Sequence, residues 1–97
     1  MATIKVKVLT ETRVKTKRSG LQCYSCSAIS SESSICIITI WNEEQLKHLV
    51  VGQYVIIRDC QLHQKDEVVF VQLRETSKVC YFIFTVIIFL QTDIQFL

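Results

Sequence analysis

The chain has 97 residues, enough for one domain of ordinary size. Its hydrophobic fraction of 49% is that of a globular protein, so disorder along the whole chain is not expected. The net charge of +2 is unevenly spread: residues 1–20 carry six basic side chains and one acidic one, and residues 21–97 carry five basic and eight acidic ones. A local basic patch attracts phosphate groups, although a lysine-protected edge strand would give the same pattern.

The first segment, residues 3–17, alternates apolar and polar side chains, with Ile4, Val6 and Val8 on one face. A strand of this length exceeds the usual ~5–6 residues, so we expect a bulge or bend near its middle. A basic turn ending at Gly20 follows it.

Four more strands are predicted, at residues 21–29, 35–41, 53–63 and 68–73. In the strand at residues 35–41, Cys36, Ile38 and Ile40 share the face expected to fill the core, and Thr39 and Trp41 share the other face.

A short helix is predicted between the third and fourth strands. Asn42 is an acceptable N-cap, Glu43 and Glu44 suit the first turn, and Gly52 can end the connection. Five strands with a helix between the third and fourth are the order of the OB-fold. We therefore predict a mainly β protein, a five-stranded OB-fold Greek-key barrel over residues 1–78, followed by an apolar C-terminal segment over residues 79–97.

The C-terminal segment contains twelve residues, Val79 to Leu90, of which Thr85 alone is polar. A membrane-spanning helix needs ~20 residues, so membrane association is not expected. The segment is an extra strand or helix packed on the barrel, a marginal tail anchor, or sequence outside the native domain. Its first part, residues 79–84, is predicted to pair beside the first strand.

The runs S-I-C-I-I-T-I-W-N-E-E, from Ser34, and L-V-V-G-Q-Y-V-I-I-R, from Leu49, resemble single-stranded-DNA-binding OB-folds. The resemblance is to the simple single-OB proteins of the sensor-of-single-stranded-DNA complex and to replication protein A domains. It implies single-stranded DNA or RNA as ligand, and repair or replication proteins as partners. Three features depart from the family pattern: Gln53 replaces a usual Asp, the turn at Ser33 and Ser34 has no Gly, and Gln61, His63 and Lys65 stand where relatives often carry aromatic rings.

Binding on such a barrel requires rings that stack on bases and cations that follow phosphates. Trp41 is the first candidate ring, the alternative being a plug at the barrel mouth. Phe70 is exposed if Val69 and Val71 face the core, and buried otherwise. The full set of candidate nucleic-acid-binding residues is Trp41, Phe70, Tyr24, Thr39, Lys15, Lys17, Arg18, Arg58 and Lys65.

The sequence gives little support for metal binding or catalysis. Cys23 and Cys26 have zinc-ligand spacing, but residues three apart in a strand point to opposite faces, and a second such pair is missing, so no metal or other cofactor is expected. The sequence carries no catalytic motif, and we expect no enzyme activity. The five cysteines (23, 26, 36, 60 and 80) and the polar N-terminus favour free thiols in the nucleus or cytoplasm rather than secretion.

Two functions are therefore retained. The first is non-catalytic binding of single-stranded nucleic acid in DNA replication or repair. The alternative is an OB-fold protein-interaction module that does not bind nucleic acid, a hypothesis motivated by the missing rings and by the acidic balance after residue 20.

Overall fold

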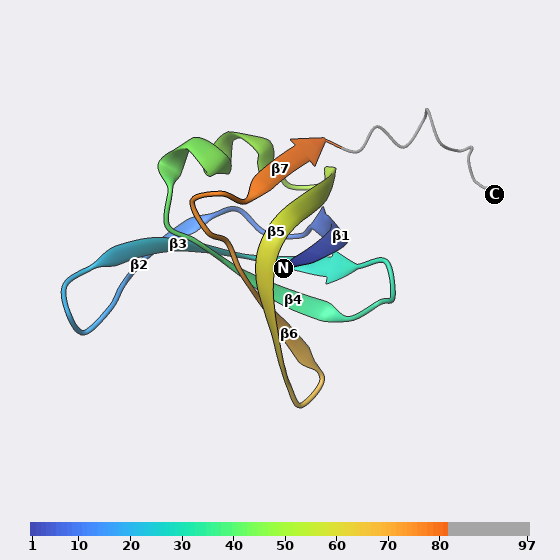
Figure 1. Ribbon diagram of the computed structural model, residues 1–97, viewed down its shortest axis with the longest axis horizontal. Helices are drawn as coiled ribbons and strands as arrows, with labels where there is room; N and C mark the ends of the chain where they lie inside the picture. Colours follow the sequence, from blue (N-terminus) through green and yellow to red (C-terminus); the bar gives the residue numbers. More distant parts are fainter. Residues whose placement is uncertain (82–97) are drawn as a thin grey trace.

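The computed structural model describes residues 1–81, which form seven strands and one short 3-10 helix (Figure 1). The elements are β1 (Ala2–Val8), β2 (Arg13–Thr16), β3 (Gln22–Ser30), β4 (Ile35–Ile40), η1 (Glu43–His48), β5 (Tyr54–Lys65), β6 (Val68–Gln72) and β7 (Lys78–Tyr81).

Five of these strands close a barrel. β1 pairs antiparallel with β3, and β3 with β4. β4 pairs parallel with β6, β6 pairs antiparallel with β5, and β5 returns to β1. This is the Greek-key barrel of the OB-fold, so the predicted fold class is confirmed. β2 and β7 extend the sheet by pairing with β3 and β5.

The expected bend in the first segment is a full interruption between β1 and β2. Both strands lie along β3, with Val8 opposite Ala28 and Arg13 opposite Ser25. Across the gap, the Ser27 amide donates to the Thr10 hydroxyl at 2.8 Å, so the hydroxyl replaces one hydrogen bond of the ladder. The interruption lets the chain leave the barrel and continue as a projecting hairpin.

The core follows the predicted alternation. Cys36, Ile38 and Ile40 of β4 are fully buried, as are Val55 and Ile57 of β5. Because side chains alternate across a strand, the odd-numbered residues of β4 are left on the outer surface of the barrel.

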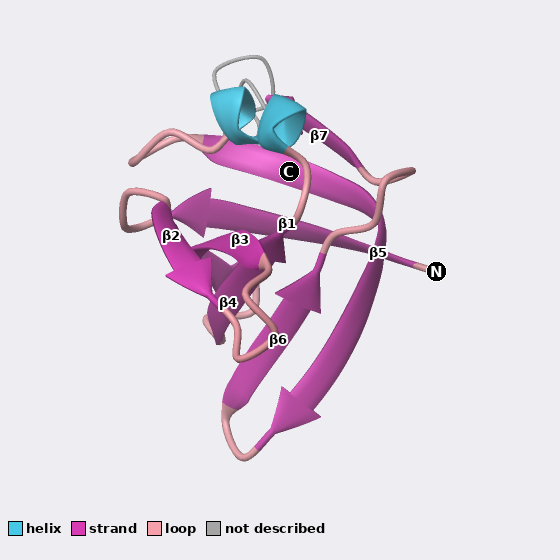
Figure 2. Cartoon of the chain, turned by 90° about the vertical axis from the view of Figure 1, so that its left-hand side faces the viewer, coloured by secondary structure: helices cyan, strands magenta, loops and turns pink. Residues whose placement is uncertain are grey.

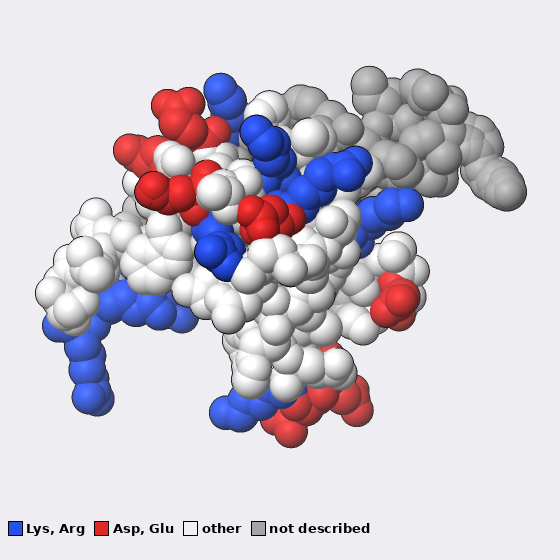
Figure 3. Space-filling view, viewed as in Figure 1, with Lys and Arg blue, Asp and Glu red and all other residues white. Residues whose placement is uncertain are grey.

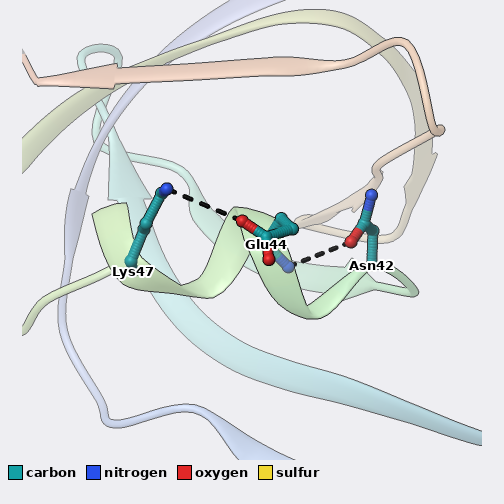
Figure 4. Close-up of polar contacts among 3 residues, drawn as sticks. All are labelled: Asn42, Glu44 and Lys47. Atoms are coloured by element: carbon teal, nitrogen blue, oxygen red, sulfur yellow. Dashed lines mark hydrogen bonds and ion pairs between the residues drawn. The ribbon is translucent and has the colours of Figure 1, made fainter.

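η1 connects β4 to β5 over one end of the barrel, beside β7 (Figure 2). The Asn42 Oδ1 atom accepts a hydrogen bond from the Glu44 amide at 2.9 Å, which confirms the predicted N-cap (Figure 4). Lys47 Nζ lies 3.6 Å from the Glu44 carboxylate, one turn further along. Gly52 ends the connection with a φ of +86°, a conformation that glycine adopts without strain.

The pairing of β7 differs from the pairing predicted from the sequence. Residues 78–81 pair with Val55 to Arg58 of β5, so the predicted pairing of this segment beside the first strand is wrong. Both edges of β1 are already occupied by β3 and β5, whereas the other edge of β5 is open. The remainder of the predicted strand and of the apolar segment lies outside the described residues. No helix in the described part is long and apolar enough to cross a membrane.

Candidate nucleic-acid interface

Two hairpins project from the barrel, one formed by β2 and β3 and the other by β5 and β6 (Figures 1 and 2). Both carry basic side chains, and the surface between them is largely uncharged and hollowed (Figure 3). The outer faces of β4 and β6, which pair with each other, lie between the two hairpins. This arrangement provides an open face flanked by projecting cations.

A groove of about 810 Å³ lies at the end of β4, and we call it the Trp41 groove. The Trp41 side chain is 40% exposed, and Lys17 Nζ lies 5.9 Å from the centroid of its ring. The indole is therefore a surface ring in cation–π contact and is not buried inside the barrel. The groove is lined by Gln22, Tyr24, Trp41, Asn42, Glu43, Glu44, Leu73, Arg74 and Glu75.

Carboxylates dominate the charge of the Trp41 groove. Burial, and then a hydrogen bond and the negative charge of Glu43, raise the pKa of the Tyr24 hydroxyl, so the Glu43 carboxylate lies beside that ring. Glu75 comes from the segment between β6 and β7. That segment is tied to η1 because Gln45 Nε2 donates to the carbonyls of Arg74 and Ser77 at 2.9 and 3.1 Å.

A second hollow of about 390 Å³ surrounds Phe70, and we call it the Phe70 pocket. Phe70 is 39% exposed while Val71 is buried, which decides the alternative that the sequence left open. His63 lies directly opposite Phe70 in the β5–β6 ladder, with ring centroids 6.5 Å apart. The lining carries no carboxylate and consists of Thr39, Gln61, Leu62, His63, Phe70, Val71 and Gln72.

The candidate cations are divided between the two hairpins. Lys15, Lys17 and Arg18 are exposed on the β2–β3 hairpin, whose turn is closed by a hydrogen bond of 2.7 Å from the Lys17 amide to the Leu21 carbonyl. Lys65 precedes the β5–β6 turn, where it is followed by Asp66 and Glu67. The first hairpin is thus a purely basic arm, and the second carries mixed charge.

The structure brings most of the predicted site residues into two groups. Tyr24, Trp41 and Lys17 meet at the Trp41 groove, and Thr39 and Phe70 line the Phe70 pocket. Arg58 joins neither group, because it lies on β5 between Thr3 of β1 and Lys78 of β7.

Several lining residues were missed from the sequence. The position of His63 could have been predicted, because a two-residue turn at Asp66 and Glu67 places it opposite Phe70. Glu75 and Arg74 carried no such signal, since they reach the groove through the folding of the β6–β7 segment against η1.

The two cysteines with zinc-ligand spacing lie on different sides of β3. Both are buried, but Cys26 belongs to the hydrophobic core, whereas Cys23 lies outside it, opposite Lys15 of β2. Burial raises the pKa of the Cys26 thiol to about 11, which disfavours the thiolate that a metal needs. Within residues 1–81, no three potential metal ligands lie close enough together to hold an ion.

Comparison with protein-family models and with curated proteins finds no match. Among solved structures, the barrel is similar to the solution NMR structure of a replication factor A related protein from Methanobacterium thermoautotrophicum. The TM-score is 0.57 at 18% identity, and the alignment covers 84% of this chain and 82% of that chain. A likeness at this level of identity establishes a shared fold.

Proposed function

We propose that this protein is a non-catalytic module that binds single-stranded nucleic acid, DNA in the first place. The observation that carries the proposal is the pair of exposed rings, Phe70 on β6 and Trp41 directly after β4, between two projecting hairpins. Phe70 is paired with Ile37 of β4, four residues before Trp41. Since a strand rises about 3.3 Å per residue, the two rings are separated by roughly 13 Å along β4.

The physical basis is stacking combined with phosphate attraction. Every base has a π-face, and stacking on an aromatic side chain contributes ~1–3 kcal/mol per base. Lys15, Lys17 and Arg18 form a basic arm beside the Trp41 groove and would contact the phosphates. The barrel interior is filled by side chains such as Ile38 and Ile57, so the ligand must lie on the outer face.

The similar solved structure supports a place in DNA replication, because that protein is related to replication factor A, and we extend the proposal to DNA repair. Protein subunits of such a complex are the further partners that we propose. The five cysteines are free thiols, which supports a reducing compartment such as the nucleus or cytoplasm.

The test uses Trp41, the single tryptophan of the chain, as its own reporter. The full-length protein is titrated at two salt concentrations with a single strand of about 12 nucleotides, within the ~4–16-nucleotide range of such folds, and with the matching duplex. We expect quenching by the single strand that weakens as salt rises. An unchanged emission spectrum at high DNA concentration and low salt contradicts the proposal.

A protein-interaction module is the second candidate, favoured by the carboxylates Glu43, Glu44 and Glu75, which repel phosphate. Replacing Lys15, Lys17 and Arg18 together by Glu separates the two. In a protein-interaction module, capture of the protein partner survives this change and the unmodified protein does not bind nucleic acid.

A further inference from the structure

We infer that the Trp41 groove selects bases that carry an exocyclic amino group, so that cytosine binds there in preference to thymine. The inference rests on the proposed function and adds to it a preference among bases. It is argued from the donors and acceptors that surround the two rings of the groove.

Hydrogen-bond acceptors are available beside the rings. Glu43 and Tyr24 both line the groove, and an ionised carboxylate can accept several hydrogen bonds. Glu75 lines the same groove, and its carboxylate forms no hydrogen bond or ion pair with any residue of the described chain. Glu44 contributes less, because it is paired with Lys47 on the exposed side of η1 (Figure 4).

Donors in the groove come from neutral amides and from one cation. Gln22 and Asn42 line it with amide groups, and Arg74 lines it with its guanidinium. Arg74 Nη1 lies 3.2 Å from the Met1 sulfur. The Asn42 Oδ1 atom is used by the Glu44 amide, which leaves the side-chain NH₂ group as the one donor of Asn42. The charged groups of the lining are three carboxylates and one guanidinium, so the groove carries a net negative charge.

This imbalance distinguishes the two pyrimidines. Cytosine presents an N4 amino group, from which a carboxylate accepts a hydrogen bond. Thymine presents the O4 acceptor at that position, and its one donor, N3–H, lies between two carbonyl oxygens that a carboxylate repels. In a single strand this edge of the base is not occupied by pairing. The same carboxylates repel phosphates, so the strand would present a base to Glu43 and Glu75 while its backbone follows the Lys17 side.

The Phe70 pocket provides an internal contrast. Its polar lining includes Gln61 and Gln72, whose amides donate as well as accept, and it contains no carboxylate. A base stacked on Phe70 is therefore bound without this preference, and selection is confined to the Trp41 groove.

The experiment compares fluorescein-labelled oligo(dC) and oligo(dT) of equal length by anisotropy, at neutral to weakly alkaline pH, where cytosine stays unprotonated. The proteins are the unmodified chain, the double variant Glu43→Gln/Glu75→Gln, and the control Glu67→Gln, which removes a carboxylate at the β5–β6 turn outside the groove. We expect the unmodified chain to prefer oligo(dC) by at least about fivefold, the lower bound for a good contact between a side chain and a base edge. The double variant should lose the preference and gain affinity for oligo(dT), and the control should keep the preference.

Three results overturn the inference. Equal affinity of the unmodified chain for both strands refutes it and leaves the proposed function intact. A preference that persists in the double variant shows that other groups read the base. If no oligonucleotide binds and a lysine-rich peptide quenches Trp41 in the unmodified chain but not in the double variant, the groove is a protein-binding site, and the proposed function is refuted as well.

Discussion

The Trp41 groove and the Phe70 pocket present rings of nearly equal exposure, 40% and 39%, in opposite chemical surroundings. Carboxylates from η1 and from the β6–β7 segment surround the indole, and a lysine from the β2–β3 hairpin lies over it. The phenyl ring has no carboxylate among its neighbours, which are chiefly His63 and two glutamines. The comparison teaches that exposure identifies a ring available for stacking, whereas the neighbours decide which ligand it accepts.

The two sites also differ in how they are built. The Phe70 pocket lies on three hydrogen-bonded strands, β4, β5 and β6, whose registers place every lining side chain. The Trp41 groove is assembled from separate segments held by contacts such as that of Gln45 with the carbonyls of Arg74 and Ser77. A change that loosens tertiary packing should therefore disturb the Trp41 groove before it disturbs the Phe70 pocket.

The largest expected effect sharpens the difference between the two hairpins. Replacing Lys15, Lys17 and Arg18 by Gln should lower affinity for a single strand about a hundredfold at about 0.1 M salt and reduce the logarithmic salt slope by about 2, as expected for three lost phosphate contacts. The matched control is Arg58→Gln, an exposed cation outside both sites. An equal loss in the control would mean that charge acts without regard to position.

Trp41→Ala comes next. We expect an affinity loss of about tenfold or more, since stacking on a ring contributes ~1–3 kcal/mol per base. Trp41→Phe should retain most of the affinity, as the ring is kept. Anisotropy of a labelled strand measures binding and thermal unfolding measures stability. If Trp41→Phe lost as much affinity as Trp41→Ala, keeping an aromatic ring would make no difference, and stacking would not explain the loss.

Phe70→Ala should cost about fivefold, near the lower end of the ~1–3 kcal/mol range for one stacked base, because the neighbouring His63 ring remains. The loss should be the same for oligo(dC) and oligo(dT), since carboxylates are absent from the Phe70 pocket. A loss confined to oligo(dC) would mean that the preference for cytosine arises at the Phe70 pocket and not at the Trp41 groove.

The smallest effect concerns the cap of η1. Asn42→Ala removes the hydrogen bond to the Glu44 amide and should lower the free energy of unfolding by about 1 kcal/mol, the usual value of an N-cap. Asn42→Asp keeps the acceptor and serves as the control in urea unfolding. Because Glu43 follows the cap directly, the alanine variant should also weaken the preference for oligo(dC). Unchanged stability in Asn42→Ala would show that the cap is dispensable.

Local pattern alone was enough to predict the barrel strands and, for β1 and β4, the side of the strand that faces the core. Ile38 and Ile40 were predicted inside, and Trp41 was predicted to share the outer face of β4. The period of two along a strand and the capping chemistry at Asn42 are properties of adjacent residues, so they can be read without knowing the fold.

Tertiary structure alone decided which strands became neighbours and what surrounds each ring. The pairing of β7 with β5 followed from the occupied edges of β1, and Glu75 reached the Trp41 groove through the contact between Gln45 and the β6–β7 segment. These arrangements join residues that are far apart in the chain, such as Arg58 with Lys78 and Gln45 with Ser77. No local periodicity encodes such contacts, because they depend on which edges and surfaces the rest of the chain leaves open.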